Sequence, residues 1–126
     1  MLEQLKILVV EDDPDQLIIR CMLLSHHGYE TRRAGDAATA VRIATEDQPD
    51  VAIVDLRLPT EEIGTSLIRE LKMLRPALTI IVLTGRDPKS LQQIPDLALA
   101  DEILQKGNSS VALLDSLAKV KVSLER

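Results

Sequence analysis

The 126-residue chain is long enough for one folded domain with a sizeable core but too short for two. Its net charge of −5 and the lack of a basic stripe argue against nucleic-acid binding, which requires clustered Lys and Arg. With one Cys, no Trp or Phe and a single Tyr, the chain excludes a disulfide framework and a thiolate metal site, and its core must be aliphatic.

Neither a signal-peptide pattern nor an apolar run of membrane-spanning length is present. We therefore expect a single domain over residues 1–126, located in the cytoplasm, without a membrane partner.

Short apolar runs alternate along the chain with segments of helical periodicity. The expected strands cover residues 7–10, 29–33, 51–54, 79–83 and 103–105. The expected helices cover residues 14–27, 36–48, 65–74, a short segment from 88, and a last helix that Asn108 or Ser109 caps. Parallel strands need such crossovers, so the pattern predicts an α/β fold with a doubly wound, five-stranded parallel sheet and five helices.

Helix boundary signals refine this prediction. Asp13 precedes Pro14 as an N-cap, and Gly28 is placed to end the first helix. Residues 59–64 are predicted to form a polar loop before the third helix. Pro95 would remove an internal hydrogen bond, so the fourth helix should be short or broken near Ile94.

Four strands end in a chemically useful residue. Glu11 and Asp12 follow the first strand, Asp55 the third, Thr84 the fourth and Lys106 the fifth. In open α/β sheets, ligands bind outside the carboxyl ends of the strands, where these groups would meet. Clustered carboxylates require a cation, and hard oxygen ligands suit Mg²⁺. The set predicts in-line phosphoryl transfer to Asp55, with the lysine and the hydroxyl on the phosphoryl oxygens.

These residues resemble the receiver domains of two-component response regulators over nearly the whole chain. The stretch ILVVEDDP at 7–14 is similar to the family's opening strand and acidic pair, and DLRLP at 55–59 to its phosphoacceptor and following loop. Thr84 and Lys106 match its hydroxyl and lysine, and Gly85 the small residue that leaves room for the phosphoryl group. The resemblance implies a flavodoxin-like fold with strand order 2-1-3-4-5.

The resemblance also implies the roles of the site residues. Asp55 would be the phosphoacceptor, and Mg²⁺ would be bound by Asp12, by Asp55 and by the backbone carbonyl of Arg57, with Glu11 acting through water. The family's acidic pair follows the strand directly, which leaves Asp13 to its capping role. The donor would be a histidine kinase or phosphotransfer protein, and the chain would be no enzyme, catalysing only its own phosphorylation and dephosphorylation.

The chain departs from the family pattern in four places. The usual switch aromatic corresponds to Ile103, Gly107 stands where a proline follows the lysine, Gly64 comes one residue late after the phosphoacceptor, and Pro95 interrupts the fourth helix. The chemistry therefore looks intact, whereas the transmission of the signal looks unusual.

Two alternatives remain open. A degenerate receiver would act as a phosphorylation-independent binding module, although none of the five site residues is lost. A haloacid-dehalogenase-like phosphatase also uses an Asp, a Thr or Ser and a Lys, but it carries a second Asp where this chain has Arg57.

The last helix carries an unusually wide apolar arc. Its two stripes are Leu113, Leu117, Val120 and Leu124, which we expect in the core, and Val111, Leu114, Ala118 and Val122. Part of the second stripe should stay exposed and, together with the fifth strand, serve a homodimer or an effector.

Overall fold

The computed structural model describes residues 4–107 and 109–124. Five strands form one parallel sheet in the order β2-β1-β3-β4-β5. The strands are β1 (Lys6–Val10), β2 (Glu30–Ala34), β3 (Val51–Asp55), β4 (Thr79–Thr84) and β5 (Glu102–Gln105). The α-helices are α1 (Pro14–His26), α2 (Ala37–Glu46), α3 (Glu61–Leu74) and α4 (Ser109–Leu124).

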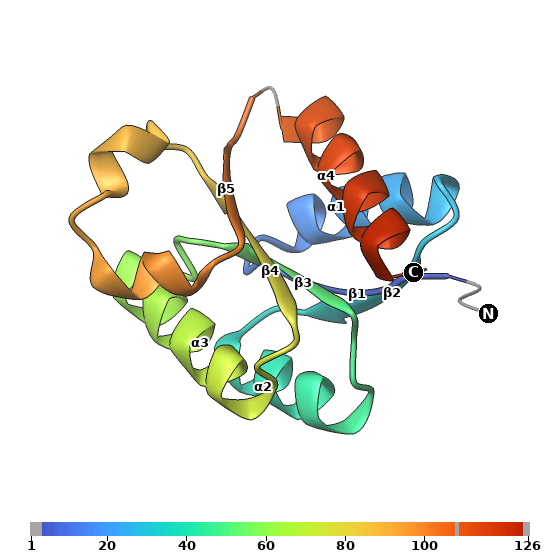
Figure 1. The fold of residues 1–126 in the computed structure, drawn as a ribbon, viewed down its shortest axis with the longest axis horizontal. Coiled ribbons are helices and arrows are strands. Elements are labelled where there is room, and N and C mark those ends of the chain that lie inside the picture. The colour runs from blue at the N-terminus through green and yellow to red at the C-terminus, as the bar shows by residue number, and fades with distance from the viewer. Residues whose placement is uncertain (1–3, 108, 125–126) are drawn as a thin grey trace.

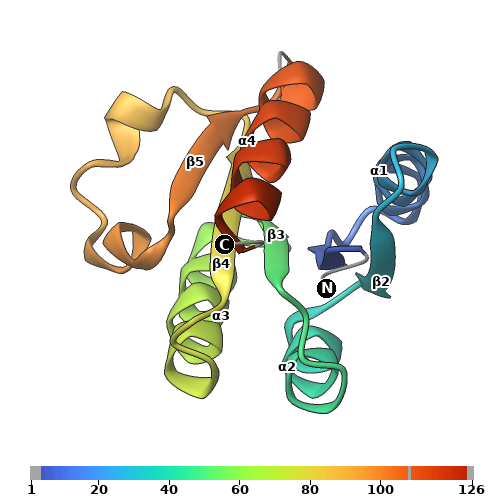
Figure 2. The same ribbon diagram turned by 45° about the vertical axis from the view of Figure 1, so that its right-hand side comes forward.

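Helices cover both faces of the sheet, as Figures 1 and 2 show. Alternate residues of the strands pack against α2 and α3 on one face and against α1 and α4 on the other. The central strand β3 is buried along its whole length, as expected for a parallel strand with helices on both sides. The doubly wound fold and the strand order predicted from the sequence are confirmed.

The expected count of five helices is wrong for the described residues. The segment between β4 and β5 forms two short 3₁₀-helices, η1 (Pro88–Leu91) and η2 (Pro95–Leu99), and the break lies at Ile94 as predicted. Pro95 has no N–H to donate into a continuing helix. Asp87 caps η1 by accepting a hydrogen bond from the N–H of Lys89 at 3.1 Å.

The predicted start of the third helix is also wrong, because residues 61–64 are helical rather than a loop. Thr60 caps α3 by accepting a hydrogen bond from the N–H of Ile63 at 3.2 Å. Gly64 lies inside the helix, where a Cβ atom would overlap the carbonyl oxygen of Leu56. Glycine is common in loops, which is why the sequence suggests a loop here. In the structure, position 64 requires glycine because its backbone and that of Leu56 approach too closely for a Cβ atom.

Other helix boundaries agree with the sequence signals. Asp13 caps α1 by accepting from the backbone N–H groups of Asp15 and Gln16, and Gly28 follows the helix with a positive φ of 88°. The predicted cap of α4 at Asn108 or Ser109 lies outside the described residues and side chains.

The wide apolar arc of α4 is only partly buried. Leu113 and Leu117 are core residues and Val120 packs against them, but Leu124, expected in the core, is 47% exposed. In the second stripe, Leu114 is half-buried and the other three residues are exposed. The prediction that part of this stripe stays exposed is confirmed. No helix in residues 4–107 and 109–124 combines the length and apolarity needed to cross a bilayer.

Candidate functional site

The sheet register brings the predicted site residues to one edge. Val10 pairs with Val54, Asp55 with Leu83, and Thr84 with Gln105. Asp55 and Thr84, the last residues of β3 and β4, therefore lie at the carboxyl edge of the sheet together with Glu11 and Lys106, the first residues after β1 and β5. The N–H of Lys106 donates to the carbonyl of Thr84 at 2.7 Å, which holds the lysine at the same edge.

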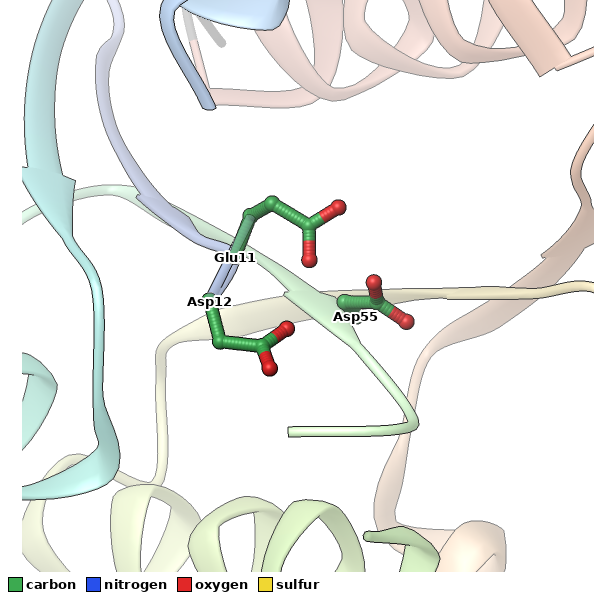
Figure 3. Close-up of side chains that lie close together, drawn as sticks. All are labelled: Glu11, Asp12 and Asp55. Carbon is green, nitrogen blue, oxygen red and sulfur yellow. The ribbon is translucent and has the colours of Figure 1, made fainter. Parts of the chain in front are cut away.

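Three carboxylates meet there. Glu11, Asp12 and Asp55 each place an oxygen within 4.8 Å of the others, and Figure 3 shows the three side chains close together, with Glu11 and Asp12 extending toward Asp55. Glu11 and Asp55 are buried at 1% and 4% exposure, whereas Asp12 is exposed. Three negative charges this close repel one another strongly unless a cation offsets them.

Two basic side chains offset part of this charge. Lys106 Nζ donates to Asp55 Oδ2 at 2.8 Å and lies 4.0 Å from Glu11 Oε1. Arg20 Nη1 lies 3.7 Å from the same Glu11 oxygen, with only 14% of its side chain exposed. Sequence reasoning missed Arg20. The available signal was its position on α1, three residues after Leu17, which places it beside the buried stripe.

The two buried carboxyls differ in their protonation. Burial, reinforced by the neighbouring Asp55 carboxylate, raises the pKa of Glu11 to about 8. Burial acts in the same direction on Asp55. The proton that Glu11 keeps and the ammonium of Lys106 both favour the charged form of Asp55, however, and together they hold the pKa of Asp55 below its usual value. Without a bound cation, Glu11 is therefore largely protonated at neutral pH and Asp55 is ionised.

A pocket of about 330 Å³ opens beside Asp55. Its lining residues are Asp55, Leu56, Arg57, Glu61, Thr84, Gly85, Arg86 and Lys106. Nothing lies within 4 Å of a Cβ atom built on Gly85, so the pocket stays open next to the hydroxyl of Thr84.

Backbone N–H groups orient the polar atoms of this pocket. The N–H of Arg57 donates to Asp55 Oδ1 at 3.2 Å, and the N–H of Arg86 donates to Thr84 Oγ at 3.0 Å. Thr84 Oγ accepts this hydrogen bond and donates none among the described residues, so its own hydrogen is available to a ligand.

The cluster fits a small divalent cation. Both carboxylate oxygens of Glu11 are buried and have no hydrogen-bond partner among the described residues, a costly state that a cation would relieve. Three carboxylates supply the hard oxygen donors that Mg²⁺ prefers, while the adjoining pocket leaves room for a phosphoryl group.

A larger cavity, of about 400 Å³, lies at the opposite edge of the sheet. It is lined mainly by the ends of α2 and α3 and the segment that follows α3, including Ala44, Leu74 and Pro76. It contains none of the acidic residues of the cluster, so the candidate site is the smaller pocket.

The chain resembles known proteins along almost its full length. A profile of the family described as response regulator receiver domain matches residues 7–118. The transcriptional regulatory protein PrrA of Mycobacterium tuberculosis is 32% identical over 121 residues, 96% of this chain and 50% of PrrA. The response regulator MprA of Mycobacterium avium is 33% identical over 122 residues, 97% of this chain and 52% of MprA. The chain thus spans about half the length of these curated relatives.

A solved structure supports the same fold. The response regulator TrrA of Thermotoga maritima, in complex with Mg²⁺ and beryllium fluoride, superposes with a TM-score of 0.83 at 24% identity, covering 93% of this chain and 99% of TrrA. These matches exclude the phosphatase alternative. The chain belongs to the receiver-domain family of two-component response regulators, and its acidic pocket is of the kind typical of phosphoacceptor sites.

Proposed function

We propose that residues 1–126 form one receiver domain that accepts a phosphoryl group on Asp55, in a Mg²⁺-dependent reaction, from a histidine kinase or phosphotransfer protein. The observation that supports this best is the state of Asp55, a buried yet ionised carboxylate at the edge of an open pocket, 2.8 Å from Lys106 Nζ. Such a carboxylate is a nucleophile that needs no general base.

In the proposed transfer, an oxygen of Asp55 attacks the phosphorus of a phosphohistidine. The new O–P bond forms as the P–N bond breaks, and the imidazole nitrogen keeps the electron pair and takes up a proton from water. The products are an acyl phosphate on this chain and a neutral histidine on the donor. This chain thus supplies the attacking carboxylate, and the donor supplies the phosphoryl group and the leaving imidazole.

Lys106 and Thr84 would hold the transferred group. The ammonium of Lys106 exchanges its contact with Asp55 Oδ2 for a phosphoryl oxygen, and the Thr84 hydroxyl donates to another. The open space beside Gly85 gives these oxygens room. Both interactions gain strength as negative charge accumulates on the phosphoryl group.

Glu11, Asp12, Asp55 and the carbonyl of Arg57 would hold Mg²⁺. The bound ion would neutralise charge on the phosphoryl oxygens during transfer. The support from this chain is the set of three carboxylates and the partnerless oxygens of Glu11, and Mg²⁺ accompanies the beryllium fluoride of TrrA.

Incubation with phosphoramidate and Mg²⁺, followed by intact mass spectrometry, tests the proposal. We expect one added phosphoryl group, labile to base, that is absent from Asp55→Asn and present in the control Asp15→Asn, which changes an exposed aspartate on α1. Lys106→Ala should keep the fold and weaken the structural response. Wild-type incorporation in Asp55→Asn would exclude Asp55 as the acceptor.

One observation favours the second candidate, a phosphorylation-independent binding module. Val111 and Val122 of α4 are 70% and 55% exposed, which leaves an apolar face available to a second copy or an effector whatever the state of Asp55. Self-association or effector binding of equal strength in wild type and Asp55→Asn, with no adduct in either, would support this role instead.

A further inference from the structure

Arg86 connects the phosphoacceptor pocket to η1. Its Nη1 atom donates to Glu61 Oε1 at 2.6 Å, and its Nη2 atom contacts the carbonyl oxygen of Ser90 in η1 at 3.4 Å. Arg86 and Glu61 both line the pocket that contains Asp55 and Thr84. One guanidinium therefore joins the first turn of α3 to η1 across the pocket where the phosphoryl group would arrive.

These contacts are weak enough to exchange. The side chains of Arg86 and Glu61 are 45% and 26% exposed, and ion pairs of that exposure contribute little because solvent screens them. The contact with Ser90 is long for a hydrogen bond. Neither contact would hold the guanidinium against a strong competing anion.

A phosphoryl group on Asp55 would be such a competitor. It carries roughly two negative charges and three acceptor oxygens, and a planar guanidinium binds phosphate through two parallel hydrogen bonds. The glutamate carries a single charge. Phosphorylation thus changes which partner in the pocket Arg86 prefers.

Loss of the Arg86 contact would affect η1 through Ser90. Ser90 is otherwise bonded within its own turn, where its Oγ and N–H both donate to the carbonyl oxygen of Asp87, at 2.7 and 2.9 Å.

Residue 103 is an aliphatic Ile that lines an apolar pocket of about 290 Å³ with Leu91 and Leu97. It offers no ring hydroxyl to connect the phosphoacceptor site to this segment.

We propose that Arg86 is a phosphoryl-binding residue that leaves Glu61 and Ser90 when Asp55 is phosphorylated and thereby releases η1 from α3. This inference rests on the proposed function of Asp55. It assigns the transmission of the signal to the Arg86–Glu61 pair instead of to residue 103.

The test follows the backbone amide resonances of η1 in isotopically labelled protein, before and after phosphorylation with phosphoramidate and Mg²⁺. Wild type should show shifts at Ser90 and Leu91. Arg86→Gln, which keeps hydrogen-bonding capacity but removes the charge, should still give the Asp55 adduct by intact mass and lose these shifts. Arg69→Gln is the matched control, because Arg69 of α3 pairs with Asp96 of η2 at 3.8 Å and does not line the pocket; it should retain the shifts.

Glu61→Gln supplies an independent readout. Removing the competing carboxylate should tighten binding of beryllium fluoride in the presence of Mg²⁺, measured by fluorine resonance titration, whereas Arg86→Gln should weaken it. Full η1 shifts in phosphorylated Arg86→Gln, or equal loss in Arg69→Gln, would overturn the exchange. An adduct without η1 shifts in wild type would refute the exchange alone, and no adduct in wild type would refute the proposed function together with it.

Discussion

Glu11→Gln offers a direct measurement of what the acidic cluster costs the Mg²⁺-free protein. Burial and the nearby Asp55 carboxylate raise the pKa of Glu11 from 4.5 to about 8. At about 1.4 kcal/mol per pKa unit this rise corresponds to roughly 5 kcal/mol. We therefore expect a penalty of a few kcal/mol for the ionised carboxylate.

The sign of the pH dependence follows from the direction of the shift. Below pH 4.5 the carboxyl of Glu11 is protonated in both the folded and the unfolded chain, so it carries no penalty. Between pH 4.5 and about 8 the unfolded chain releases this proton while the folded chain keeps it, so the free energy of unfolding falls as pH rises. Above that range the penalty is complete.

A glutamine resembles the protonated glutamate and removes this penalty. With Mg²⁺ removed by a chelator, Glu11→Gln should raise the free energy of unfolding by a few kcal/mol near pH 8 and change it little at about pH 5. Urea unfolding at both pH values measures the difference. Asp12→Asn is the matched control, because it removes a carboxylate of the same cluster that is exposed, and it should show a much smaller effect.

Mg²⁺ should reduce the stability advantage of Glu11→Gln over wild type. A ligand that binds only the folded state adds about 2.7 kcal/mol at a hundred times its Kd, and both Glu11→Gln and Asp12→Asn should lose most of this gain. If the two variants have equal stability in chelator near pH 8, or if Mg²⁺ stabilises either as much as wild type, the account of a buried, cation-seeking Glu11 is wrong.

Three further outcomes are expected. Gly64→Ala should lower the free energy of unfolding by about 1–3 kcal/mol, because its methyl group would overlap the Leu56 carbonyl; thermal unfolding at or above the wild-type midpoint would contradict this. Arg20→Met should tighten Mg²⁺ binding by removing a positive charge 3.7 Å from the cluster, and unchanged affinity in calorimetric titration would show that Arg20 does not compete with the ion. Leu117→Ala should cost about 2–5 kcal/mol and Val122→Ala about 0.5 or less, because the first is fully buried and the second 55% exposed; similar losses would mean that α4 packs differently.

Much of the fold could be predicted because the relevant signals are local. The apolar run before Asp55 predicts a strand buried on both faces, and the cap at Asp13 depends only on the following two or three residues. The predicted meeting of Glu11, Asp55 and Lys106 required only that all strands be parallel, because every parallel strand then ends at the same edge.

The tertiary structure decided what depends on residues distant in the sequence. The prediction that Gly64 lies in a loop is wrong because the need for glycine at this position comes from the Leu56 carbonyl, eight residues earlier and in another segment. The proximity of Arg20 to the acidic cluster depends on how α1 docks, and the Arg86–Glu61 pair joins two different loop–helix junctions.

The sequence by itself therefore determined the order of the elements and the identity of the acidic and basic groups at the strand ends. Only the packed chain decided which of these groups are buried, and hence that Glu11 holds its proton while Asp55 does not. The physical reason is that helix caps and periodicity depend on neighbours along the chain, whereas desolvation and charge interactions depend on distances that exist only once the sheet and helices have assembled.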